Sequence, residues 1–169
     1  PVLTVKNLTA GPGISFDEVN YTTVEDHEEY IKRTDPELGD LLISKDGTLG
    51  VTRLVRTETT FSIFVSLALV KPVLRTMGVY LEAAFQSPFF QERFKATGSG
   101  LLHIHLVDLR AAALPIAPLA EQELVAERAR EALARLDATA LYNQEILASL
   151  GSLDRAILAK AFRGELVPQ

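Results

Sequence analysis

The feature that most restricts the fold of this chain is a proline-free segment near its carboxyl end. After Pro118 the chain runs to Phe162 without another proline and with one glycine, Gly151. That composition predicts a single helix of about 40 residues within 118–163, about 60 Å long at 1.5 Å per residue. Residues 1–115 are too few to cover a helix of that length. We therefore expect the helix to pack against a partner.

Apolar side chains recur within the expected helix at spacings of three and four residues. The stripe consists of Val125, Ala129, Ala132, Leu136, Ala140, Asn143, Leu147, Leu150, Leu153 and Ile157. A stripe this narrow is typical of a coiled-coil seam rather than of a helix lying on a globular core. We therefore expect it to pack on a second copy of the chain or on a partner subunit. Asn143 is its polar member, and a buried asparagine can fix helix register at some loss of stability.

The residues before the helix predict a small α+β domain over 1–115, because strand and helix patterns alternate there without a regular rhythm. In "GDLLISKDGTLGVTRLV" (39–55), two apolar runs flank Asp46-Gly47, which predicts a hairpin with a tight type I′ turn and positive φ at both residues. "FSIFVSLALV" (61–70) predicts one mostly buried strand that Lys71-Pro72 ends.

The patterns that follow predict two helices and a strand. "YLEAAFQ" (80–86) has helical spacing. "SPFFQERFKATG" offers Ser87 as N-cap, Pro88 at the first helical position and Gly98 as a stop. "LLHIHL" (101–106) predicts a short strand.

Charge is distributed unevenly along the chain, whose formal net charge is −5. Residues 1–40 carry three basic and nine acidic side chains, residues 41–110 carry eight and five, and residues 111–169 carry six and eight. The middle part is therefore the one positive block, which favours a polyanionic partner such as nucleic acid. On charge alone, scattered solvated side chains explain the pattern equally well.

The composition argues against several classes of protein. Cysteine is absent, which excludes disulfide scaffolds, thiol catalysis and thiolate metal sites and fits a cytoplasmic location. No signal-peptide pattern is present, and the longest apolar run (61–70) is too short to span a bilayer, so we expect no membrane contact.

Catalytic and metal motifs are weak. His103 and His105 are too few for zinc without a carboxylate at ligand spacing, and His27 is expected at the surface. Ser44 and Lys45 are adjacent on a strand and point to opposite faces, so they cannot act as nucleophile and base. The glycine loops "GPG" and "GSG" do not link a strand to a helix in dinucleotide-binding fashion. We expect no catalysis, no metal and no cofactor.

Polar side chains near the predicted hairpin are better candidates for binding. Lys45 belongs to the hairpin turn, and Lys95, Thr97, Ser99 and His103 gather around a later loop. Lysines and small hydroxyl donors suit contacts with phosphates and base edges, although an ordinary polar loop has the same composition.

Four stretches in order resemble the specificity subunit of type I restriction–modification systems. They are "GDLLISKDGTLG" (39–50), "YLEAAFQSPFFQERFKATGSG" (80–100), "LPIAPLAEQ" (114–122) and "ILAKAFRGELVPQ" (157–169). The family's double proline before the helix is Ala117-Pro118 here. Its recognition domain also begins before "PVLTVKNLTAG", so we expect the first strand of that domain to be absent.

The resemblance implies a DNA-binding scaffold without chemistry of its own. A family member usually has two target recognition domains and two long helices that pack antiparallel, and it binds methyltransferase and restriction subunits. This chain resembles one half: a target recognition domain (1–115), a long dimerisation helix (118–163) and a tail (164–169). Two copies related by a twofold axis would then read the two outer parts of an interrupted, palindromic target in double-stranded DNA.

The resemblance also implies which loops face DNA. By matched position, Lys45, Asp46, Gly47 and Thr48 form the turn of the first motif, and Lys95, Thr97, Ser99 and His103 form the loop of the second. We expect Arg53, Arg56 and Lys71 to add phosphate contacts. The glycines and Thr48 can equally be needed only to hold the hairpin.

Two other functions remain open from the sequence. A coiled-coil adaptor with a protein-binding head is favoured by the acidic first forty residues and disfavoured by the basic middle. A nuclease fragment is the second alternative, and a metal-dependent cleavage assay would detect it.

Overall fold

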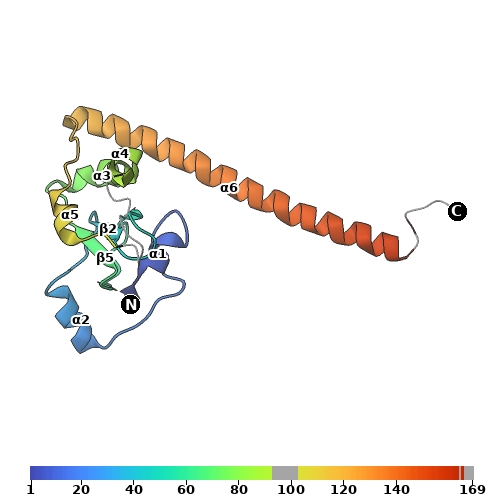
Figure 1. The fold of residues 1–169 in the computed structure, drawn as a ribbon, viewed down its shortest axis with the longest axis horizontal. Helices are drawn as coiled ribbons and strands as arrows, with labels where there is room; N and C mark the ends of the chain where they lie inside the picture. Colours follow the sequence, from blue (N-terminus) through green and yellow to red (C-terminus); the bar gives the residue numbers. More distant parts are fainter. Residues whose placement is uncertain (93–102, 164, 166–169) are drawn as a thin grey trace. The chain divides into compact units, whose positions relative to one another are not determined.

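The computed structural model describes residues 1–92, 103–163 and 165 of the chain (Figure 1). Its elements are β1 (Val2–Leu3), α1 (Val5–Thr9), α2 (Val24–Ile31), β2 (Leu41–Ser44), β3 (Thr52–Leu54), β4 (Ser62–Ile63), β5 (Leu67–Val70), the 3-10 helix η1 (Arg75–Met77), α3 (Gly78–Gln86), α4 (Pro88–Gln91), α5 (Leu106–Ala111) and α6 (Leu119–Phe162). Two compact units, Pro1–Ala126 and Glu127–Gln169, make up the chain. The first unit combines strands and helices, which confirms the expected α+β class.

The core of the first unit forms on both faces of β2, the middle strand of an antiparallel sheet with the order β3-β2-β5. Successive strand residues point to opposite faces. Leu41 and Ile43 therefore pack with Phe85 and other side chains of α3 and α4, whereas Leu42 packs with Phe61 on the other face. All four residues of β2 are buried because both faces are covered.

The single strand predicted over 61–70 is wrong. This segment forms two strands in different sheets: β4 runs parallel to β1, and β5 joins β2. Phe64 and Val65 lie exposed between them, and the amide of Leu67 donates to the Phe64 carbonyl (2.9 Å). Apolar composition does not distinguish one strand from two strands around a tight turn. As expected, β5 ends directly before Lys71.

The hairpin predicted over 39–55 is present, but the predicted turn type is wrong. β2 and β3 pair antiparallel and are connected by residues 45–51. Gly47 and Gly50 have φ values of 71° and 75°, whereas Asp46 does not have a positive φ. A type I′ turn needs positive φ at both central residues, so Asp46-Gly47 cannot form one here.

The helices α3 and α4 agree with the sequence patterns. Pro88 occupies the first position of α4 and Ser87 precedes it, as expected. The Ser87 hydroxyl donates to a carbonyl of α3 (2.6 Å) instead of accepting an amide of α4, so no side-chain cap forms. The predicted stop at Gly98 lies outside the described residues.

The strand predicted over 101–106 is wrong in its described part. His103 makes only an isolated antiparallel bridge with Asp46, and Leu106 is already the first residue of α5. Leu101 and Leu102 lie outside the described residues. The described part of this alternating segment, residues 103–105, therefore precedes the helix α5 and does not form a strand.

The long helix α6 is uninterrupted from Leu119 to Phe162, drawn from orange to red in Figure 1. Its first turns belong to the first unit, where Gln122 and Ala126 are buried and the Gln122 amide donates to the Ala117 carbonyl (2.6 Å). From Glu127 onward, the described side chains of α6 are exposed apart from a half-buried alanine. The second unit therefore has no core within the described residues.

Candidate nucleic-acid interface

The turn between β2 and β3 presents a short exposed tip on a buried, hydrogen-bonded base. Ser44 is fully buried, and its hydroxyl accepts from the Val51 amide (2.9 Å) while its carbonyl accepts from the Gly50 amide (2.8 Å). The tip residues Gly47 and Thr48 are exposed. A tip with exposed backbone and hydroxyl groups can reach phosphate or base-edge atoms.

Lys45, Asp46 and His103 form one charged cluster at the base of this tip. The Asp46 carboxylate contacts Nδ1 of His103 through one oxygen and Nζ of Lys45 through the other (3.4 Å). Burial raises the pKa of Asp46, but the hydrogen bonds from His103 and Lys45 and the positive charge of Lys45 outweigh it and hold this pKa below its usual value. The carboxylate is therefore charged and paired at neutral pH.

Three of the four residues predicted on the second loop lie outside the described residues: Lys95, Thr97 and Ser99. The structure describes the fourth, His103, and brings it to the β2–β3 turn. Its ring also lies edge-to-face on that of His105, with centroids 4.6 Å apart. No group of three or more metal-ligating side chains occurs among the described residues.

The three cations predicted to add phosphate contacts have partners within the fold. Arg53 donates to the carbonyls of Gly11 (2.9 Å) and Gly13 (3.3 Å) and so holds the loop after α1. Arg56 contacts both carboxylate oxygens of Glu82 (3.3 and 2.6 Å). A phosphate would have to compete with these contacts, so their role in DNA binding stays a prediction.

Lys71 bridges two carboxylates, those of Asp40 (2.9 Å) and Glu37 (3.1 Å). Burial lowers the pKa of Lys71, but the hydrogen bonds to Asp40 and Glu37 and their negative charges raise it above its usual value. Asp40 is fully buried and also accepts the Glu37 amide (2.8 Å). Lys71 thus neutralises a buried charge.

Sequence reasoning missed Glu82, which is buried in α3 and accepts the Leu54 amide of β3 (2.8 Å). Its second partner is Arg56. The sequence feature that could have revealed this role is a single acidic residue within the otherwise apolar "YLEAAF". Buried carboxylates are almost always paired, so such a residue predicts an internal partner. His27, expected at the surface, is half-buried and bonds through Nδ1 to the Ser62 hydroxyl (2.7 Å).

A groove of about 600 Å³ lies beside the turn and shares Lys45 with it. Aromatic and aliphatic side chains line much of it, among them the exposed Tyr21, Phe64 and Val65. The cations along it are Lys45 and Arg33, and its described lining holds no carboxylate. Exposed apolar surface of this kind is typical of an interaction site.

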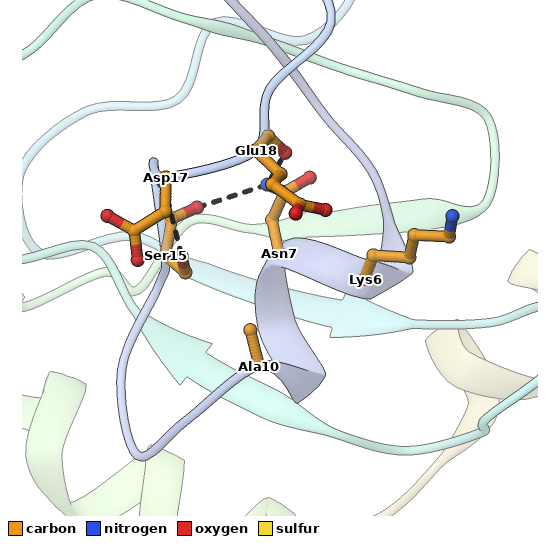
Figure 2. Close-up of a pocket in the computed structure, with 6 residues that line it drawn as sticks. All are labelled: Lys6, Asn7, Ala10, Ser15, Asp17 and Glu18. Carbon is orange, nitrogen blue, oxygen red and sulfur yellow. Dashed lines mark hydrogen bonds between the residues drawn. The ribbon is translucent and has the colours of Figure 1, made fainter.

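A smaller pocket of about 320 Å³ lies beside α1 and is acidic at its rim (Figure 2). The Asn7 amide donates to the carbonyls of Ser15 (3.1 Å) and Glu18 (2.9 Å), which ties the following loop to the helix. Asp17 and Glu18 outnumber Lys6 around it, so the pocket disfavours phosphate.

The predicted stripe on α6 is largely solvent-exposed in its described part. Val125, Leu147, Leu150, Leu153 and Ile157 are 42–68% exposed, and Ala132 and Asn143 are also exposed, whereas Ala129 is half-buried. The side chains of Leu136 and Ala140 lie outside those that the structure describes. In the described parts of the chain, no helix combines the length and hydropathy that a bilayer crossing needs.

Two curated relatives from Escherichia coli are similar to the chain. The specificity subunit of the type I restriction enzyme EcoBI is 28% identical over 141 residues, which covers 82% of this chain. The specificity subunit of the type I restriction enzyme EcoKI, from strain K12, is 28% identical over 178 aligned positions and covers the whole chain. This chain is homologous to type I restriction enzyme specificity subunits. It spans 30% and 38% of the length of these relatives.

The crystal structure of the HsdS subunit from Thermoanaerobacter tengcongensis is 27% identical to the chain, with a TM-score of 0.47. The match covers 78% of this chain and 31% of that one. No family model matches the chain.

Proposed function

We propose that this chain is a DNA-recognition subunit of a type I restriction–modification complex. Homology to two specificity subunits carries the proposal, and one of the two matches extends over the whole chain. The proposed role is non-catalytic, as specificity subunits are the recognition subunits of their enzymes. The exposed Gly47-Thr48 tip of the hairpin and the positive charge of residues 41–110 support the DNA contact.

The proposed DNA contact predicts a strong dependence of affinity on salt. Each phosphate that the chain neutralises releases counterions, so the slope of log K against log[salt] becomes more negative by about 0.9 per contact. Fluorescence anisotropy with a labelled random-sequence duplex, measured for the full chain across a salt series, gives this slope. A coiled-coil adaptor with a protein-binding head would show no such binding, and that result would contradict the proposal.

Target specificity is a separate part of the proposal: the first unit reads one half of an interrupted site. Selection from a random duplex library by the complex assembled with its methyltransferase subunits would then enrich two half-sites at a fixed separation. If the two copies are related by a twofold axis, these half-sites form an inverted repeat. Enrichment of a continuous site would contradict half-site reading.

Partner subunits are the third part of the proposal. The exposed stripe on α6 and the apolar groove beside the turn support contacts with a second copy of the chain and with methyltransferase and restriction subunits. Two copies would pack their α6 helices antiparallel. Apolar surface left in water on both features is the physical reason to expect protein partners there.

A nuclease function is the remaining alternative. A cleavage assay on supercoiled plasmid with the full chain and Mg²⁺ or Mn²⁺ tests it, and we expect no nicking. Cleavage that a chelator abolishes would replace the recognition proposal by a catalytic one.

A further inference from the structure

Two segments far apart in the sequence are joined at the base of the exposed tip. Asp46 and His103 form an antiparallel bridge, and Nδ1 of His103 contacts the Asp46 carboxylate. Next to this bridge, the Ile104 amide donates to the Lys45 carbonyl (2.8 Å), and the Ile104 side chain is 3% exposed. Backbone hydrogen bonds and a side-chain contact therefore both join residues 103–104 to residues 45–46.

The charged side chains at this junction are hydrogen-bonded to one another. One Asp46 oxygen faces His103 and the other faces Lys45, whose side chain is only 13% exposed. The Lys45 amide donates to the Ser66 carbonyl (2.9 Å), which ties the same residue to the turn before β5. Among the described residues, the His105 ring is a further titratable group in contact with His103.

We propose that Asp46 and His103 act as a positioning pair that holds the Gly47-Thr48 tip, rather than as DNA contacts themselves. This inference rests on the proposed DNA-recognition function and reassigns two residues that the sequence placed on the DNA-facing surface. The pair fixes the position of the tip before DNA arrives, so less conformational freedom is lost on binding. Lys45, which contacts the other Asp46 oxygen, offsets the charge of a carboxylate that would otherwise repel phosphates.

The salt dependence of binding distinguishes a positioning residue from a contacting one. We expect Asp46→Asn and His103→Gln each to weaken duplex binding about threefold to tenfold while the slope of log K against log[salt] stays that of the wild type. The double variant should bind no more weakly than the weaker single variant, because both substitutions break one interaction. A loss of about 0.9 from the slope in His103→Gln would show a direct phosphate contact and overturn the inference.

His27→Gln is the matched control, because His27 also bonds to a buried side chain, that of Ser62, but this partner belongs to β4 and not to the β2–β3 turn. It should leave both affinity and slope unchanged once the protein is folded. Asp46→Glu keeps the carboxylate and should recover part of the affinity that Asp46→Asn loses. No recovery, together with additive effects in the double variant, would mean that the two residues act independently.

Hydrogen exchange tests the pair without DNA. The Ile104 amide should exchange faster in Asp46→Asn and in His103→Gln than in the wild type, while amides in β2 keep their protection. Unchanged exchange at Ile104 would refute the positioning role even if the protein binds DNA. If the wild type binds no DNA but Ile104 exchanges faster in both variants, the proposed function is wrong, whereas the structural link between Asp46 and His103 is still supported.

Discussion

At the scale of single residues, the two glycines of the β2–β3 turn are required for different reasons. Both have positive φ, which costs a non-glycine residue about 1 kcal/mol or more. A Cβ on Gly47 would meet nothing within 4 Å, whereas one on Gly50 would lie 2.4 Å from Oε1 of Gln91. The Gln91 amide donates to the Gly50 carbonyl (2.9 Å), so this clash would also disturb the link between the hairpin and α4.

We expect Gly50→Ala to destabilise the fold by about 2–3 kcal/mol and Gly47→Ala by about 1 kcal/mol. Urea unfolding of both variants gives the difference, and Gly13→Ala, where φ is not positive and an added Cβ would meet nothing within 4 Å, is the control. Equal losses at the two turn positions would mean that Gln91 moves aside freely.

Lys71 gives a residue-level prediction for pH dependence. Because its pKa in the fold is above its usual value of 10.5, its contribution to stability is complete below that value and is lost as the pH rises through the folded pKa. The free energy of unfolding should therefore fall as the pH is raised above about 10.5, and this part of the fall should vanish in Lys71→Met. Lys32→Met, which removes an exposed pair with Glu29, should leave it unchanged.

At the scale of elements, the sequence predicted the hairpin and three helices better than the remaining strands and the connections between elements. The hairpin, α3, α4 and α6 could be predicted from apolar spacing, Pro88 and the proline-free run. The turn of residues 45–51 could not, because Ser44 and Gln91 hold it from outside the turn dipeptide. The split of 61–70 depends on pairing with β1 and β2, which no local pattern reveals.

The same limit applied to the candidate site. Charge and position pointed to Lys45, Asp46 and His103, and the structure brings these three together. The sequence could not show that they would pair with one another. Nor could it show that Arg56 would form an ion pair with Glu82 of α3, because the burial of Glu82 is a property of the packed core.

Gly151 provides a prediction at the scale of α6. It lies within the helix, and a Cβ there would meet nothing within 4 Å. Because glycine in a helix interior costs about 0.8–1.0 kcal/mol relative to alanine, Gly151→Ala should increase helicity and thermal stability. Circular dichroism at 222 nm during a thermal scan measures both. A lower signal would mean that a partner helix approaches closely at this position, so that the methyl group obstructs packing.

At the scale of the whole molecule, the exposed stripe of α6 predicts self-association. Leu150 is 55% exposed, and a carboxylate there would be buried without a partner in a dimer seam. Leu150→Asp should therefore shift the chain from dimer to monomer, as measured by light scattering at micromolar concentration. Ser149→Asp adds the same charge to an adjacent, exposed polar position outside the stripe and should leave the dimer intact. A wild-type monomer would exclude the homodimer.

The stripe has a practical consequence, because the chain contains no cysteine. In an antiparallel pair with twofold symmetry, only residues close to the rotation axis meet their own counterparts. Single cysteines placed in turn at Val125, Asn143, Leu150 and Ile157 would thus give oxidative cross-links only near the axis, whereas a parallel pair would cross-link at every facing site. The location of the cross-linked site measures the register in which two such helices overlap.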